Sequence, residues 1–336
     1  MKKSKLLALM MIPMLVFVCV IALTACGSKG HTHNWGAWTA TLQATETNDG
    51  LETRACTHDS THIEMRMTYA TGTAGLAFTA IDDGAGYEVR RGTVTNPNVF
   101  IPAYHRESPT AAYKPVTSIG IGAFAEYGVS ALKFNLESVT FANGSNIKNI
   151  NNSAFNGCIN LKSVHIPASV QTINYSAFYM CRNLKSVAFA NGSQLESIGS
   201  SAFDSCHALE IIYIPASVKT LDSALSNCSV LKSVIFEEGS QLNSIGAAAF
   251  ASNPMLESVV IPASVTSIGT NAFFNATFTT IFYGGTSTEW DDLKNSLTGN
   301  NGNLTSLTPK YYSATTPPTN LDDFWRWVNG NPRQYA

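Results

Sequence analysis

The stretch LKSVHIPASVQTINYSAFYMC, residues 161–181, decides the fold because closely similar words return along the chain. One copy reads LKSVAFANGSQLESIGSSAFDSC over residues 184–206, and another reads LESVVIPASVTSIGTNAFF over residues 256–274. Self-similarity of this period is typical of a solenoid, whose units bury their apolar sides against neighbouring units. The repeat therefore predicts a β-rich solenoid.

An Ala-Phe pair near the end of each unit fixes the register of the repeat. After Phe155 its second member recurs every 22 to 25 residues, and short units alternate with long ones. Short units carry IPASV, where proline has no N–H for a strand ladder and should end the strand. Long units carry a turn of the FANGSQL type, where Asn-Gly allows positive φ and lets the extra residues bulge outward. The second member of the pair is Phe124, Phe155, Phe178, Phe203, Leu225, Phe250 and Phe273.

Each unit begins with a strand pattern, L-x-S-V-x-I. Side chains alternate along a strand, so Leu161, Val164 and Ile166 should point inward while Ser163 and His165 point outward. A unit of this length falls in the leucine-rich-repeat range of about 20–29 residues. We predict a leucine-rich-repeat, right-handed coil stack with short parallel strands, flanked by small β modules.

The repeat words resemble those of the BspA-like leucine-rich-repeat proteins of bacterial surfaces. The matching pieces are IPASVTSIGTNAF over residues 261–273, its near copies, and a closing FYGGTSTEWDDL over residues 282–293. The resemblance covers roughly residues 85–335. It implies a surface adhesin that binds host matrix or plasma proteins or other bacteria. A structural envelope component that tethers other surface proteins is a second interpretation.

The amino terminus has the pattern of an export signal. Three lysines within the first five residues precede an apolar run over residues 6–23 and the sequence L-T-A-C, which ends at Cys26. The ending resembles a bacterial lipobox, which implies a signal peptide over residues 1–25, lipid on Cys26 and a short tether over residues 26–30. The protein would then sit in the cell envelope, anchored by lipid at the cell surface or outer membrane. An ordinary secretion signal with an incidental cysteine is the alternative.

Residues 31–70 form a separate module. Its His-x-Trp-x-x-Trp, Gly and Arg-x-Cys pieces resemble small modules of bacterial surface proteins, although Asp59 stands where a second cysteine is expected. Cysteine and histidine are the usual ligands of zinc, so a zinc site is one interpretation. A small β module with exposed histidines and a tryptophan core is the other, and a sugar-binding role of the flanking modules is also open. The candidate zinc ligands are His33, Cys56, His58 and His62.

The remaining segments cap the solenoid, which we place at residues 116–285. Residues 71–115 are interpreted as the N-terminal cap, with a hairpin formed by residues 87–94 and 99–101. Residues 286–336 are interpreted as a C-terminal cap and an aromatic tail. Caps are expected because the last coils of a stack would otherwise expose their apolar ends.

A cysteine follows the Ala-Phe pair by three residues in four units. Because asparagine and alanine fill the same position elsewhere, we expect buried, inert thiols. Disulfides and a metal ladder are the alternatives, but stacked side chains point the same way and do not converge. The four cysteines are Cys158, Cys181, Cys206 and Cys228.

Composition and motifs argue against an enzyme and against nucleic acid. Charged residues make up 13 % of the 336 residues and the formal net charge is −2, so no basic surface is expected. The sequence has no G-x-S-x-G, Walker A, G-x-G-x-x-G or H-E-x-x-H word. We predict no cofactor beyond the possible zinc, and a protein ligand as the partner.

The outward positions of successive strands are the candidate binding surface. They become apolar toward the C-terminal half and predict an exposed stripe, which is a common feature of protein interfaces. A strand preference for β-branched residues, or a stripe covered by the tail, would also explain the pattern. The predicted partner-binding residues are His165, Tyr213, Ile235, Val260 and Phe282.

Overall fold

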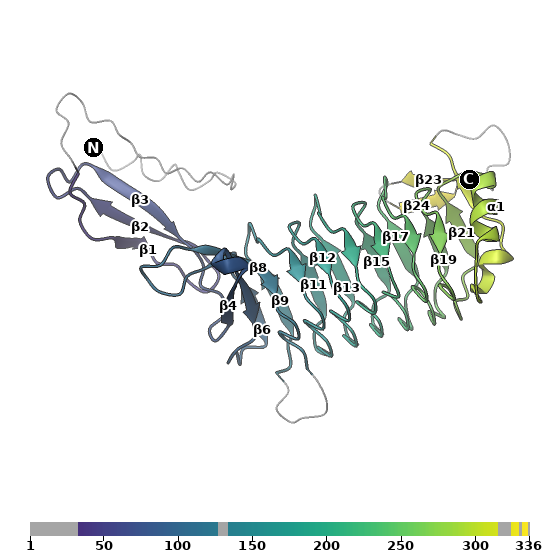
Figure 1. The fold of residues 1–336 in the computed structure, drawn as a ribbon, viewed down its shortest axis with the longest axis horizontal. Coiled ribbons are helices and arrows are strands. Elements are labelled where there is room, and N and C mark those ends of the chain that lie inside the picture. The colour runs from purple at the N-terminus through teal and green to yellow at the C-terminus, as the bar shows by residue number, and fades with distance from the viewer. Residues whose placement is uncertain (1–32, 127–133, 315–323, 329–330, 335–336) are drawn as a thin grey trace.

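A computed structural model describes residues 33–126, 134–314, 324–328 and 331–334 of the chain. It shows an elongated stack of coils with a small sheet at its N-terminal end and a helix at its C-terminal end (Figure 1). The predicted β-rich solenoid with flanking modules is confirmed.

Each coil contributes one strand to each of two ladders that run the length of the stack. The front ladder contains the longer strands: β6 (Asn98–Ile101), β9 (Ser138–Phe141), β11 (Ser163–Ile166), β13 (Ser186–Phe189), β15 (Ile211–Ile214), β17 (Ser233–Phe236), β19 (Ser258–Ile261) and β21 (Thr280–Tyr283). The back ladder contains β5 (Gly86–Arg90), β8 (Lys114–Ile119), β10 (Asn149–Ile150), β12 (Thr172–Ile173), β14 (Ser197–Ile198), β16 (Thr220–Leu221), β18 (Ser244–Ile245) and β20 (Ser267–Ile268). Neighbouring strands within each ladder run parallel wherever they pair.

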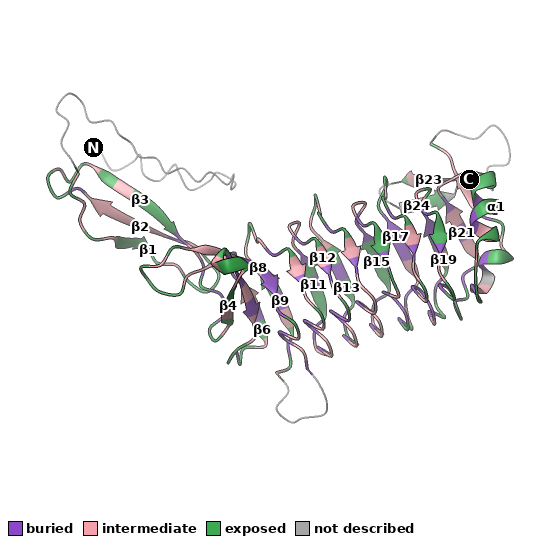
Figure 2. Cartoon of the chain, in the orientation of Figure 1, coloured by how far each residue is buried: buried purple, intermediate pink, exposed green. Residues whose placement is uncertain are grey.

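Alternating burial along the strands builds the core. In β11, Val164 and Ile166 are buried while Ser163 and His165 are exposed, as the sequence pattern predicts. Figure 2 shows buried and exposed stretches along the stacked strands. Leu161, just before the strand, is also fully buried. Burying a leucine, valine or isoleucine side chain stabilises a protein by about 1.5–3 kcal/mol, so a stack of such strands is held by its interior.

The Ala-Phe pairs form a column inside the stack. The rings of Phe155 and Phe178 lie 5.0 Å apart and those of Phe178 and Phe203 lie 5.2 Å apart, nearly parallel in both cases. The backbone N–H of each Phe before the last coil donates to the carbonyl of the Ala in the next coil, as from Phe178 to Ala202 at 2.8 Å, and that of Phe273 donates to Asn301 Oδ1 at 3.3 Å. Leu225 interrupts the ring column between Phe203 and Phe250.

The long-unit turns bulge outward as predicted. Gly144, Gly192 and Gly239 adopt positive φ values of 70°, 72° and 78°. A side chain at any of the three would meet nothing within 4 Å, so the turns project into open space. The extra residues therefore lengthen the coil without disturbing its core.

At the N-terminal end, the prediction of a hairpin between residues 87–94 and 99–101 is wrong. Strand β5 pairs with β4 (Ala77–Ile81) on one side and β8 on the other, whereas β6 pairs with β9 in the front ladder. The two segments thus belong to opposite ladders and begin the first coil. The hairpin prediction failed because two short apolar runs separated by a turn also describe the two sides of one coil. A short strand β7 (Tyr104–His105) and the 3-10 helix η2 (Asp82–Gly84) complete this end.

The C-terminal end is closed by α1 (Ser287–Asn295), whose first turn carries a capping box between Thr286 and Glu289. This helix buries Trp290 and Leu293 against the last coils. After the 3-10 helix η3 (Gly302–Thr305), strands β22 (Lys310–Tyr312), β23 (Phe324–Val328) and β24 (Asn331–Gln334) extend the front ladder beyond β21.

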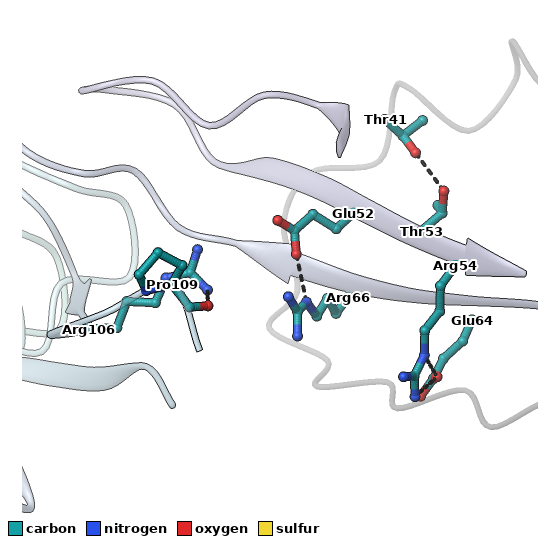
Figure 3. A network of polar contacts seen from close by, with 8 residues as sticks. All are labelled: Thr41, Glu52, Thr53, Arg54, Glu64, Arg66, Arg106 and Pro109. Atoms are coloured by element: carbon teal, nitrogen blue, oxygen red, sulfur yellow. Dashed lines mark hydrogen bonds and ion pairs between the residues drawn. The ribbon is translucent and has the colours of Figure 1, made fainter. Parts of the chain in front are cut away.

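Residues 39–68 form a three-stranded antiparallel sheet of β1 (Thr39–Leu42), β2 (Gly50–Ala55) and β3 (Ile63–Thr68). One face carries paired charges: Arg54 Nε donates to Glu64 at 2.6 Å, and Arg66 Nε donates to Glu52 at 2.7 Å (Figure 3). The Trp38 ring lies under both guanidinium groups, at 4.6 and 4.3 Å from its centroid. Trp38 is therefore only half-buried and packs against arginine, which corrects the expected tryptophan core.

Candidate protein-binding face

The predicted binding residues all lie on the front ladder, but only some are exposed. His165 on β11 is exposed, and Tyr213 on β15 is 43 % exposed. Ile235 and Val260, at the matching positions of β17 and β19, are only 6 % and 3 % exposed. The prediction of one continuous exposed stripe is therefore wrong in its C-terminal half.

The aromatic tail packs against the C-terminal end of this face. Phe282 is half-buried, and its ring lies 5.7 Å from that of Trp325 in β23. Trp325 Nε1 donates to the carbonyl of Tyr283 at 2.9 Å, which fixes the indole against the last coil. Sequence alternation predicts the direction of a side chain but not whether another part of the chain buries it. The open part of the front face therefore lies over β9 to β15.

The front ladder is divided between β13 and β15, which share no ladder hydrogen bonds. Strands β6, β9, β11 and β13 form one sheet, and β15 begins another. The back ladder shows no such division, since β14 pairs with both β12 and β16. The two coils thus remain joined at the back and are unpaired at the front.

Proline explains where the front ladder weakens. Ala190 and Glu237, which follow long-unit strands, each donate their N–H to the isoleucine carbonyl of the preceding short unit at 3.0 Å. The matching short-unit residues are Pro167, Pro215 and Pro262, which have no N–H to donate.

The extent of strand pairing alternates in the same way between short and long units. Strand β11 pairs along its length with the following strand β13 but meets the preceding β9 only at Val164 and Val139. Strand β19 pairs with the preceding β17 only at Ser258 and Val259. Each of these weak junctions lies before a strand that ends in Ile-Pro, and between β13 and β15 the ladder is absent.

A groove of about 530 Å³ lies over this break. Its lining combines the apolar residues Val187, Ala188, Phe189, Ile211 and Tyr213 with Lys185, Ser186, Glu210 and Glu237. Among the large apolar side chains of the described front strands, Ile211 and Tyr213 are the two that stay more than two-fifths exposed. The Ile-Pro sequence of the short units, which predicts the end of a strand, is also the sequence signal for this groove.

Charge is distributed unevenly along the groove. Lys185 and Glu210 lie where β13 and β15 begin, and Lys232 Nζ donates to Glu210 at 2.8 Å. This hydrogen bond lowers the pKa of Glu210 and raises the pKa of Lys232. Glu237 follows β17 at the other end of the strands and accepts a hydrogen bond from the N–H of Ala216 at 3.1 Å.

A second hollow of about 350 Å³ lies on the back ladder, and all its lining residues are polar or charged. It is lined by Gln171, Thr172, Glu196, Ser197, Lys219 and Thr220. Lys219 and Glu196 form an ion pair at 3.2 Å across it, and both side chains are about half exposed. Because no large apolar side chain lines it, this hollow is a weaker candidate for protein binding than the groove.

The four cysteines of the repeat are fully buried and form no disulfide with one another. Each thiol donates to the carbonyl of the aromatic residue in the preceding coil, as from Cys181 Sγ to Phe155 at 3.1 Å. Burial raises the pKa of all four thiols, that of Cys228 to about 12, so they stay protonated and unreactive. This confirms the buried thiols expected from the sequence.

Asn253 occupies the position that cysteine holds in four other coils, and its side chain makes stronger hydrogen bonds. The sequence did not reveal these hydrogen bonds. Its side-chain amide donates to the carbonyls of Leu225 at 2.8 Å and Phe250 at 2.9 Å. Its Oδ1 accepts from the N–H of Cys228 at 2.9 Å. The position therefore satisfies a buried carbonyl of the preceding coil, and does not serve packing alone.

The candidate zinc ligands are not assembled into a metal site. The rings of His33 and His62 lie 4.9 Å apart, and Cys56 is buried beside them in the sheet, paired through its backbone with Trp35. His58 is exposed. Within the described ranges no group of three or more histidine, cysteine or acidic side chains is placed to hold a metal ion.

The predicted lipid site, Cys26, lies outside the described residues. Among the residues that are described, no helix has both the length and the apolar character needed to cross a membrane.

Comparison with known proteins identifies the class as leucine-rich-repeat proteins. The model of the BspA type leucine-rich-repeat region, with six copies, matches residues 111–220 and 148–280. This chain belongs to that family. A search of curated proteins found no match.

Several solved structures are similar to this chain, and the first of those that follow shares its fold. A leucine-rich-repeat protein of T. pallidum is 22 % identical, with a TM-score of 0.50 over 60 % of this chain and 86 % of that one. A leucine-rich-repeat protein of Bacteroides ovatus is 23 % identical, with a TM-score of 0.47 over 72 % of this chain and 70 % of that one. The pneumococcal vaccine antigen PcpA is 19 % identical, with a TM-score of 0.41 over 74 % of this chain and 88 % of that one.

Proposed function

We propose that this chain is a bacterial cell-surface protein that binds another protein on the open part of its front face. Leucine-rich-repeat solenoids offer an extended surface for partners and no preformed catalytic cleft. The observation that carries the proposal is the exposure of Ile211 and Tyr213 over a groove, while the next coils bury the matching Ile235 and Val260. Exposed aromatic and aliphatic side chains with a polar surround are typical of protein-binding sites.

The partner we propose is a host matrix or plasma protein, or a surface protein of another bacterium. The chain would be held to the envelope by lipid on Cys26, so that the solenoid projects from the surface. Family membership supports this assignment, and the polar N-terminal half of the face, with Ser163 and His165, supplies the hydrogen-bonding rim of such a site.

The test is binding of the full-length chain to panels of purified matrix and plasma proteins and to whole bacteria. Tyr213→Ser should weaken the observed binding by about tenfold or more, because aromatic side chains at the centre of an interface commonly dominate affinity. Phe274→Ser is the matched control, since Phe274 is equally exposed, at 45 %, but lies outside the front strands.

Equal losses in the two variants would move the site away from the front face. A wild-type chain that bound none of these partners would instead favour the structural role in the envelope.

A further inference from the structure

We propose that the groove between β13 and β15 binds an extended peptide segment of a partner protein, and that the segment carries an acidic residue, an apolar or aromatic centre and a basic residue in line. This inference rests on the proposed protein-binding function of the same face, and it names the chemistry of the segment that is recognised. Three features of the groove support it: its apolar floor, its length and the opposite charges at its two ends.

The floor of the groove is apolar and would bury apolar side chains of a partner. Phe189 of β13 is half-buried, and Tyr213 and Ile211 of β15 are 43 % and 42 % exposed. Tyr213 matches Ile235 of the neighbouring strand in register, yet Ile235 is buried. The exposure is therefore confined to the coil beside the break, where a large apolar side chain of a partner would contact both strands.

The length of the groove fits a short extended segment. The strands that border it are four residues long. At about 3.3 Å per residue they span roughly 13 Å, the length of about four residues of extended peptide.

The two ends of the groove differ in charge. At the start of the strands, Glu210 is already paired with Lys232, and Lys185 makes no ion pair with another described residue. Lys185 is therefore the charged side chain at this end that a carboxylate of the partner would meet. At the other end, Glu237 uses one carboxylate oxygen on the N–H of Ala216 and is followed by the exposed Glu238.

The negative end is particular to this coil. The turns that match Glu237 and Glu238 carry the uncharged pairs Ala142–Asn143 and Ala190–Asn191. Complementarity thus places an acidic side chain of the segment at Lys185 and a basic one at Glu237, with the apolar centre between them.

The experiment uses two fluorescent peptides of the same composition, read by anisotropy against the full-length chain. One has the order glutamate, tryptophan, valine, lysine, and the other has the glutamate and lysine exchanged. We expect the wild-type chain to prefer one order by about three- to tenfold, since exposed charge pairs have modest effects. The double variant Lys185→Glu/Glu237→Lys should prefer the opposite order, whichever way the peptide backbone runs.

A matched control carries the same two charge changes in an earlier coil. Lys148→Glu/Glu137→Lys leaves the net charge unchanged and alters two exposed residues outside the groove lining, so the wild-type preference should persist. Ile211→Ser/Tyr213→Ser should abolish the binding of both peptides, with the circular dichroism spectrum unchanged.

The inference is overturned if the wild-type chain binds neither peptide, or if the charge-reversed variant keeps the wild-type preference. Retained binding of a whole partner protein by the double charge variant, together with no peptide binding, would reject the groove while leaving the proposed function standing. If the wild-type chain binds no partner protein at all, the proposed function is rejected instead.

Discussion

At the scale of single residues, the position three residues after the Ala-Phe pair holds neighbouring coils together. A thiol or amide there donates to a buried carbonyl of the coil before it. Thiols are weak donors, whereas the Asn253 amide makes two N–H···O bonds and its oxygen accepts a third. The same position therefore contributes differently to stability from coil to coil.

We predict that Asn253→Ala lowers the free energy of unfolding by about 1–3 kcal/mol or more, because it leaves buried carbonyl and N–H groups without partners. Asn253→Cys should cost less, since cysteine donates to the equivalent carbonyl in four other coils. Urea unfolding followed by circular dichroism measures both. Equal destabilisation by the two changes would show that the hydrogen bonds at this position contribute little.

The sequence could predict the repeated core residues but not these bonds. Alternation alone predicts that Leu161, Val164 and Ile166 point inward, and all three are buried. The role of Asn253 depends on carbonyls supplied by two different coils, 3 and 28 residues away, whose positions follow only from the stacked structure. Exposure at Ile235 and Val260 was mispredicted for the same reason, because it depends on what covers the sheet.

At the scale of elements, the alternation of short and long units sets the strength of strand pairing on the front ladder. Strands that end in Ile-Pro pair well with the strand that follows and poorly with the strand that precedes. The front ladder is therefore a series of strand pairs, and the junction between β13 and β15 is its weakest point. The proline was visible in the sequence, but its effect on a neighbouring coil required the register of the stack.

We predict that Pro215→Ala strengthens this junction. Alanine restores an N–H that can donate to the carbonyl of Phe189, as Ala190 donates to Ile166 at 3.0 Å. Hydrogen exchange of the amides in β13 and β15 should become slower, and the groove should bind apolar probes less well. Pro262→Ala is the comparison, because β17 and β19 already share part of a ladder and should change less. Faster exchange in β13 and β15 would contradict the proline explanation.

At the scale of the whole molecule, the solenoid lies between two different ends. The three-stranded sheet with its paired charges occupies the N-terminal end, and α1 with the aromatic strands closes the C-terminal end (Figure 1). The proposed lipid on Cys26 would place the sheet nearest the membrane and the groove several coils away from it. Partners could then reach the groove without contacting the lipid surface.

We predict that Cys26→Ala releases the protein into the aqueous phase of a detergent partition, or leaves an uncleaved precursor of higher mass. A thioether-linked lipid needs the Cys26 sulfur, and removing it removes the anchor. Cys158→Ala is the control, because that thiol is buried in the solenoid and should leave partitioning unchanged. Recovery of the wild-type chain wholly in the aqueous phase would contradict lipid anchoring.

The division of the front ladder also makes the stack mechanically asymmetric. Bending that widens the front face separates β13 from β15, which share no ladder bonds, whereas bending that widens the back must break the bonds joining β14 to β12 and β16. The molecule is therefore more compliant in one direction than in the other. A chain tethered at one end and pulled by a bound partner would flex at this junction, and the groove would change shape under load.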